Sequence, residues 1–161
     1  MEDHPIVTRI LKVLEEAGAW HEHFSHEPVR TSEEAAELRP GYSLRQGAKA
    51  LIVRTRMAGG GRQFVMLVVP GDARFDSARV KQALGAKDLR FATPDEVAEL
   101  TGGVEPGGVP PFGNLFGLPV VTDPSLYEND TIIFNASRTH SIAMRTKDYR
   151  ALLAPLVASI V

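Results

Sequence analysis

The chain has no cysteine, and this absence removes several classes of chemistry. Without thiols the protein can form no disulfide, no thiolate metal site and no cysteine nucleophile. It also carries little net charge, because 18 lysines and arginines stand against 20 acidic residues and give a formal net charge of −2. No strong global field therefore draws it to nucleic acid, and any contact with RNA must use a local basic patch.

Long apolar runs are absent as well. No stretch of the sequence approaches the roughly 20 apolar residues that a membrane-spanning helix requires, and the N-terminus lacks the basic-then-apolar pattern of a signal peptide. The 161 residues are 43% hydrophobic, which is enough for one domain with its own core. We expect a single domain over residues 1–161, located in the cytoplasm and not associated with a membrane.

Helix and strand patterns alternate along the chain and predict an α/β (α+β) fold with a mixed sheet. The predicted helices cover residues 5–17, 32–38, 75–84, 94–100 and a last segment from about 147, capped by Thr146 and broken near Ala151 by Pro155. The predicted strands cover 20–24, 46–54, 63–69, 89–92, 118–122, 131–135 and 141–145. The strand over 63–69 is apolar on both faces, which indicates a central strand covered on both sides.

Two features stand out as candidates for chemistry. The first is the loop Gly102–Gly113, which contains five glycines and three prolines. Together with the preceding threonine its sequence is TGGVEPGGVPPFG. Clustered glycines let backbone amides converge on a ligand, and we expect Gly107 and Gly108 to adopt conformations open only to glycine. The second is Lys49, a lone lysine in the apolar run AKALIV. Partly buried lysines are rare unless paired or functional, although a lysine at a sheet margin that extends to water is the alternative.

Other polar clusters permit further hypotheses. His21, His23 and His26 form an H-x-H-x-x-H pattern that could hold a metal, with surface histidines as the alternative. Ser137 and His140 follow an apolar strand and could form a nucleophile and base, but no nucleophile elbow surrounds the serine, and a polar pocket lining is the alternative. A phosphate-binding rim, or simply a solvated charged surface, is predicted from six basic residues: Arg54, Arg56, Arg62, Arg138, Arg145 and Lys147.

Several segments together resemble one family. They are Thr31–Ala36, Gln46–Val53, Leu84–Arg90, Thr101-Gly102 followed by Gly107–Gly113, and Phe134–Ser137. In their order and spacing they are similar to the YbaK/prolyl-tRNA synthetase-associated editing-domain family, from about Ile10 to Leu153. Members of that family are aminoacyl-tRNA deacylases, acting in trans or in cis, with a mixed, strongly bent sheet surrounded by helices.

The resemblance implies that Lys49, Gly107 and Gly108 act in catalysis. It implies substrate-binding roles for Phe24, Thr31, Ile52, Pro110, Phe112, Gly113, Asn135, Ala136, Ser137 and His140. Phe24 stands where some members carry a tyrosine, so one pocket wall lacks a hydroxyl. The implied substrate is a tRNA whose 3′ end carries a wrong small amino acid (alanine, serine, cysteine or threonine), and an aminoacyl-tRNA synthetase is a further candidate partner. No metal and no cofactor are implied.

The chemistry of these residue types is compatible with ester hydrolysis. An aminoacyl ester is already activated, so water can attack it if the ester is oriented and the oxyanion is stabilised by backbone amides. Lys49 would hold the terminal adenosine phosphate or the region of the carbonyl as a point charge. A non-catalytic module of the same fold, binding a tRNA end, a nucleotide or a synthetase, is the alternative.

Overall fold

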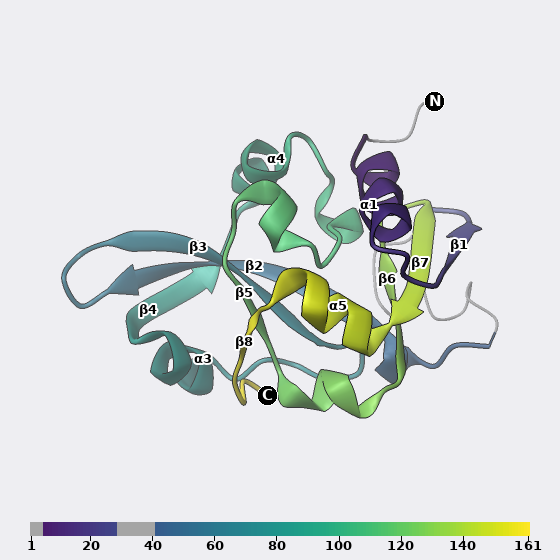
Figure 1. Ribbon diagram of the computed structural model, residues 1–161. Helices are drawn as coiled ribbons and strands as arrows, with labels where there is room; N and C mark the ends of the chain where they lie inside the picture. Colours follow the sequence, from purple (N-terminus) through teal and green to yellow (C-terminus); the bar gives the residue numbers. More distant parts are fainter. Residues whose placement is uncertain (1–4, 29–40) are drawn as a thin grey trace.

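The computed structural model describes residues 5–28 and 41–161 (Figure 1), so the predicted capping box at Thr31 and the helix over 32–38 lie outside the described residues. The α-helices in the described part of the chain are α1 (Pro5–Glu16), α3 (Ser77–Leu84), α4 (Pro94–Thr101) and α5 (Thr146–Leu153). The strands are β1 (His21–Ser25), β2 (Ala48–Met57), β3 (Arg62–Pro70), β4 (Ala86–Phe91), β5 (Val120–Thr122), β6 (Thr131–Asn135), β7 (His140–Arg145) and β8 (Leu156–Val157). Short 3-10 helices are η1 (Leu44–Gln46), η2 (Pro106–Gly108), η3 (Gly113–Phe116) and η4 (Pro124–Glu128).

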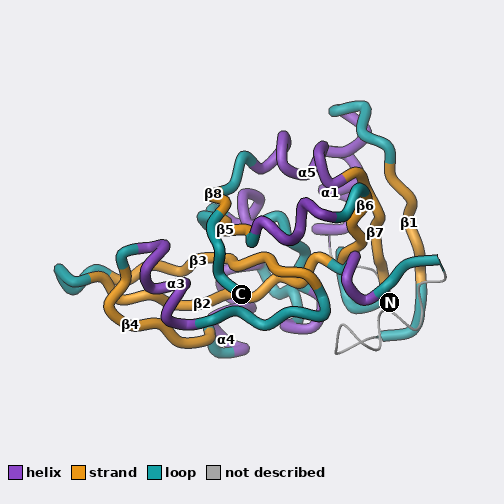
Figure 2. Tube along the Cα trace, turned by 90° about the horizontal axis from the view of Figure 1, so that it is seen from below, coloured by secondary structure: helices purple, strands orange, loops and turns teal. Residues whose placement is uncertain are grey.

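The strands form two sheets. A mixed sheet has the order β4-β2-β3-β5-β8, with antiparallel pairs around β2 and parallel pairs on both sides of β5. An antiparallel sheet has the order β1-β7-β6, and a single bridge between Gly47 and Ile133 joins it to the start of β2. Figures 1 and 2 show the β2–β3 hairpin with β4 projecting at one end of the molecule and β1, β6 and β7 at the other. The expected α/β fold with a mixed sheet is confirmed.

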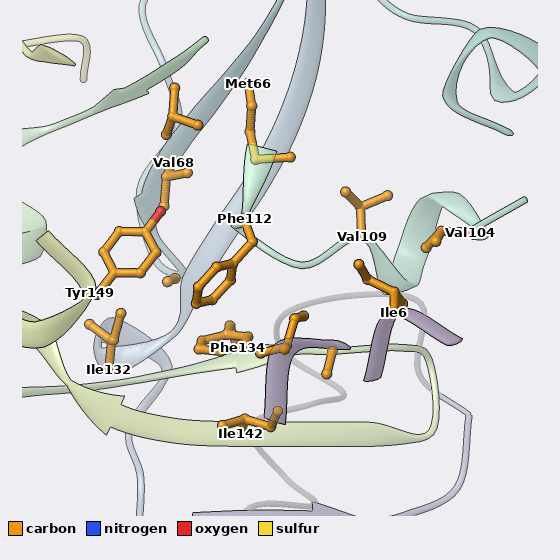
Figure 3. Packing of buried hydrophobic residues seen from close by; sticks show 14 of the residues in the cluster. Ile6, Met66, Val68, Val104, Val109, Phe112, Ile132, Phe134, Ile142 and Tyr149 are labelled. Atoms are coloured by element: carbon orange, nitrogen blue, oxygen red, sulfur yellow. The ribbon is translucent and has the colours of Figure 1, made fainter. Parts of the chain in front are cut away.

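Strand β3 is central, as its two apolar faces predict. Met66 and Val68 lie in one buried cluster with α1, β6 and β7, whereas Val65 and Leu67 lie in a second cluster with α3. Side chains alternate across a strand, so a strand flanked on both faces must be apolar at every position. The first cluster, shown in Figure 3, is the larger and lies beneath the candidate site.

Local capping signals predict two of the helix boundaries well. Thr93 and Glu96 form the expected capping box at the start of α4. Asp76 accepts from the amides at the start of α3, and Gly85 ends that helix in a left-handed conformation. These interactions are local in sequence, which explains why the pattern alone identifies them.

The last helix differs from the prediction. Thr146 is its first residue rather than its cap, and the capping position is Arg145, which makes no side-chain capping hydrogen bond. The helix ends at Leu153, two residues before Pro155, because proline disfavours a helical conformation at the residue before it. Leu156 and Val157, predicted on the helix, instead form β8 beside β5.

Candidate active site

The glycine–proline loop is docked on the polar corner between β6 and β7. The Asn135 side-chain amide donates to the carbonyl oxygen of Gly107 over 3.1 Å. A Cβ atom at Gly108 would lie only 2.5 Å from the backbone nitrogen of Arg138 and 2.9 Å from the carbonyl carbon of Ser137. Glycine is therefore required at position 108 because two backbones meet there. The predicted glycine-only conformation is wrong for both residues, since neither Gly107 nor Gly108 has a positive φ.

The two loop glycines differ in what their amides can do. The Gly108 amide donates to the carbonyl of Glu105 over 2.9 Å within the loop's own turn, so its predicted role as a donor to substrate is not available in this conformation. The Gly107 amide has no acceptor among the described residues. Gly107 is half-buried, at the point where the loop meets Asn135. A backbone donor without an acceptor can bind a developing oxyanion.

The second half of the loop is part of the core. Phe112 is fully buried between Phe134 and Tyr149, with ring-centroid distances of 5.4 and 5.6 Å (Figure 3). The Tyr149 hydroxyl donates to the carbonyl of Pro111 over 2.6 Å, and burial raises the pKa of Tyr149. This hydroxyl thus stays protonated and fixes the Pro–Pro turn on α5.

Several of the predicted substrate-binding residues are in the core. The buried members of that set are Ile52, Pro110, Phe112, Gly113 and Ala136. A Cβ at Gly113 would lie 2.7 Å from the Val120 side chain, so this glycine also serves close packing. Three of these residues are the core-facing end of the loop itself, and Ile52 and Ala136 pack in the same buried part of the molecule. Their contact with substrate remains a prediction.

Phe24 lies on the outer face of the antiparallel sheet. It pairs with Ser141 of β7, and the ring of Tyr42 packs edge-on against it at a centroid distance of 6.0 Å. The Tyr42 hydroxyl donates to Glu22 over 2.7 Å. Burial and the hydrogen bond to Glu22 raise the pKa of Tyr42 to about 12, so the hydroxyl stays a donor at neutral pH. Tyr42 was missed in the sequence because nothing local links it to β1.

A histidine–serine contact lies beside Phe24. The Nε2 atom of His26 is 2.7 Å from the Ser141 hydroxyl, and its Nδ1 atom is 2.8 Å from the carbonyl oxygen of Glu27. A carbonyl can only accept, so Nδ1 is the donor to Glu27. Ser141 has no exposed surface. The pair therefore fixes the imidazole at the edge of the site and does not present a serine nucleophile.

The hypothesis of a Ser137–His140 dyad is not supported. The Ser137 hydroxyl bonds the amide and hydroxyl of Thr139, whereas His140 Nδ1 lies 2.7 Å from His23 Nε2. The two imidazoles are stacked with ring centroids 4.9 Å apart. Among the described residues, no group of three or more histidine, aspartate or glutamate side chains could hold a metal ion.

Lys49 is at the start of β2, as predicted. Its ammonium donates to the carbonyl oxygen of Ala73 over 2.6 Å. Alternation puts Lys49 on the face of β2 that carries Leu51, opposite the face of Ile52, which packs in the cluster that includes Phe112. The convergence of Lys49 and the loop glycines on one substrate remains a prediction.

The six basic residues of the predicted phosphate rim do not lie in one place. Arg138 forms an ion pair with Glu105 across the docked loop. Arg56 pairs with Asp88 near the tip of the β2–β3 hairpin, far along β2 from Lys49. Arg145 lies at the other end of β7, where its guanidinium stacks 4.5 Å from the ring centroid of Trp20. A continuous basic rim is therefore wrong, and separate basic surfaces replace it.

The described helices include none with the length and apolar character needed to cross a bilayer.

Comparison with known proteins agrees with this arrangement. A family described as the aminoacyl-tRNA editing domain matches residues 26–152. The Multifunctional Ser/Thr-tRNA deacylase ProXp-y of Escherichia coli (strain K12) is 36% identical over 149 residues, covering 91% of this chain and 87% of that protein. A proline–tRNA ligase of Ralstonia pickettii is 30% identical over 99 residues, which cover 62% of this chain and 17% of the ligase.

Solved structures show the same fold. A protein described as a candidate trans-editing enzyme for prolyl-tRNA synthetase superposes with a TM-score of 0.80 at 28% identity, over 99% of this chain and 98% of that one. The match extends over both sheets and the docked loop. The chain thus belongs to the aminoacyl-tRNA editing domain family and is an aminoacyl-tRNA deacylase.

Proposed function

We propose that this protein acts in trans on tRNAs carrying a wrong small amino acid, and that it hydrolyses the ester where the loop at Gly107 meets the corner at Asn135. The observation that carries the assignment is the docked loop, in which the Asn135 amide holds the Gly107 carbonyl at 3.1 Å. That hydrogen bond fixes the peptide group between Gly107 and Gly108. The Gly107 amide belongs to the peptide group before that one, and it is the proposed donor to the developing oxyanion.

Hydrolysis at this position needs no protein nucleophile. Water attacks the ester carbonyl, the oxyanion accepts a hydrogen bond from the Gly107 amide, and the ester bond breaks to release the ribose hydroxyl. One preorganised donor of this kind lowers the barrier by about 3 kcal/mol. The neighbouring ribose hydroxyl of the substrate is the proposed carrier of the proton. Lys49 is the proposed electrostatic contact with the terminal nucleotide.

Small side chains are the proposed specificity. Phe24 and Tyr42 give the outer face an aromatic wall, and Phe24 lacks the hydroxyl that a tyrosine would add. Selection by size is coarse, because one methylene changes binding by about 1–3 kcal/mol. We therefore propose overlapping activity on seryl-, threonyl-, alanyl- and cysteinyl-tRNA. The name of the Escherichia coli relative, a Ser/Thr-tRNA deacylase, supports the first two.

The cellular setting is part of the proposal. Residues 1–161 would form one editing domain in the cytoplasm, where mischarged tRNAs arise. The likeness to a segment of proline–tRNA ligases supports a synthetase as a partner, since those enzymes carry a related segment in the same chain as the ligase.

A panel of mischarged tRNAs tests the proposal. Purified protein is incubated with Ala-, Ser-, Cys-, Thr-, Pro- and Phe-tRNA, and the remaining ester is measured over time. We expect hydrolysis of several of the small esters and none of Phe-tRNA. Tight binding of these tRNAs without loss of any ester would instead support the non-catalytic binding module.

A further inference from the structure

An open cavity of about 440 Å³ lies at the start of α5, away from the docked loop. Its lining includes Arg145, Thr146, Lys147 and Arg150 from the end of β7 and the first turns of α5, with Asp130 and Tyr127 opposite. Figure 1 shows this helix start at the arrowhead end of β7, whereas the corner that receives the loop is at the strand's other end.

The cavity is rich in positive charge. Three cations face one carboxylate, that of Asp130. Two of the cations are held in place by aromatic rings: Arg145 stacks on Trp20 at 4.5 Å, and Arg150 stacks on Tyr127 at 4.7 Å. Lys147 is exposed and forms no ion pair with any described residue. Guanidinium groups fixed in this way lose little side-chain entropy when an anion binds.

The helix terminus adds backbone donors. The Thr146 amide is used by the carbonyl of Asp130 at 3.0 Å. The amides of Lys147 and Asp148 belong to the first turn and have no intrahelical acceptor. The positive end of the helix dipole therefore faces the same cavity, which favours an anion.

A second observation is independent of the helix end. Thr146 lines the cavity, is 3% exposed, and its hydroxyl is the one buried side-chain polar atom without a hydrogen-bond partner in the described part of the chain. A polar group left in this state costs about 1–3 kcal/mol. Native structures usually complete such groups with water or an ion. The orphaned hydroxyl thus belongs to a residue that lines the cavity, next to Arg145 and Lys147 in the chain.

We propose that this cavity binds a backbone phosphate of the tRNA substrate. Cations beside aromatic rings, here the exposed Trp20 next to the cavity and the half-buried Tyr127 in its lining, are typical of surfaces that bind single-stranded RNA. Strand β7 separates the cavity from the docked loop by five residue steps, or about 17 Å. A few nucleotides of the 3′ strand span that distance while the terminal ester reaches Gly107. This inference rests on the proposed function, because tRNA is the ligand in both.

Binding of uncharged tRNA tests the inference separately from catalysis. The variant is Lys147→Ala/Arg150→Ala, and the matched control is Lys87→Ala/Arg79→Ala, which removes the same two charges from β4 and α3. Fluorescence anisotropy gives the Kd of each protein over a range of salt concentrations, and thermal melting confirms folding. We expect the cavity variant to bind tRNA about tenfold more weakly than the wild type. The slope of its log K against log salt should be smaller by about two, and the control variant should behave as the wild type in both measurements.

A second arm locates the effect. Hydrolysis of seryl-tRNA is compared with hydrolysis of seryl-adenosine, which has no backbone phosphate. The cavity variant should raise KM for the tRNA and leave kcat and the adenosine ester unaffected. A Kd no weaker than that of the control, an equal loss on both esters, or a wild type that does not bind tRNA would overturn the inference. A wild type that binds tRNA but hydrolyses no ester would refute the proposed function instead.

Thr146→Val provides an isosteric check of the orphaned hydroxyl. The inference predicts weaker tRNA binding together with unchanged or higher stability, since the unpaired oxygen is removed. Unchanged tRNA binding by this variant would contradict the role given to the hydroxyl.

Discussion

Lys49 shows how one residue combines a structural contact with a proposed role in catalysis. Its ammonium lies on the Ala73 carbonyl at 2.6 Å, so part of its environment is explained by packing between β2 and the segment after β3. The carbonyl orients the ammonium. Contact of this ammonium with the phosphate of a bound nucleotide is the proposed second role.

Replacement of Lys49 separates these two roles. Lys49→Ala should be less stable by about 2 kcal/mol, because the charged hydrogen bond is lost. Its rate of deacylation should fall by about a hundredfold or more if the charge contacts substrate. Lys49→Met keeps most of the apolar stem and should be equally inactive. Thermal melting and single-turnover hydrolysis of seryl-tRNA measure the two effects. A folded Lys49→Ala protein with near wild-type turnover would show that the lysine is structural only.

At the scale of elements, the contact of loop and corner is a packing requirement as much as a site. Gly108→Ala places a methyl group 2.5 Å from the Arg138 nitrogen, so backbone must move. We expect a loss of about 1–3 kcal/mol and a large fall in activity, because Gly107 moves with its neighbour. Gly59→Ala in the β2–β3 turn is the control, since no atom lies within 4 Å of its added Cβ and its φ is not positive. Gly108→Ala with the stability of the control would contradict this interpretation.

The C-terminal segment is held by one buried carboxylate. Asp123 is 2% exposed and accepts from the amides of Ile160 (2.8 Å) and Val161 (3.2 Å) through Oδ1. Its other oxygen accepts from the amide and hydroxyl of Ser125. Burial alone would raise the pKa of Asp123, but these hydrogen bonds outweigh burial and hold the pKa below the ordinary aspartate range.

This linkage predicts a pH-dependent contribution to stability. A depressed pKa means that the folded state favours the charged carboxylate, so its stabilisation is complete above the pKa of the unfolded chain. Asp123→Asn should therefore be less stable than the wild type at pH 7 by about 2–3 kcal/mol. The difference should shrink as the pH falls through the depressed pKa. Urea unfolding of both proteins across the acid range measures it, and a difference that stays constant with pH would show that Asp123 is not charged in the folded state.

Interactions close in sequence explain which elements the pattern predicts. The capping box at the start of α4 and the central apolar strand are confirmed, because each depends on residues within a few positions. The end of the chain was not, since Asp123 holds Ile160 across 37 residues and converts a predicted helix into a strand and a docked tail.

At the scale of the whole molecule, the sequence predicts the family and the loop but not how the site is assembled. Gly107, Asn135 and Phe24 come from three separate segments, and only the fold shows that the first two meet. Pro110 and Phe112 carry the family pattern, yet they are buried because the loop enters the core after its contact with the corner at Gly107 and Gly108. The contacts of Tyr42 with Glu22 and of His26 with Ser141 cannot be read from the sequence, because tertiary packing brings these residues together.

The sharpest test concerns the hydrogen bond that docks the loop. Asn135→Ala removes the amide that holds the Gly107 carbonyl, whereas Thr55→Val removes a comparable side-chain bond to the Gln63 carbonyl in the distant hairpin. The measurement is single-turnover hydrolysis of seryl-tRNA at saturating enzyme, with thermal melting of each variant. If the ester is cleaved at the docked loop, the hydrolysis rate of Asn135→Ala should be lower by about tenfold or more, which is equivalent to ~1.4 kcal/mol in the barrier. Thr55→Val should keep the wild-type rate although its loss of stability is similar. Equal rates for the two variants would contradict the placement of ester hydrolysis at this loop.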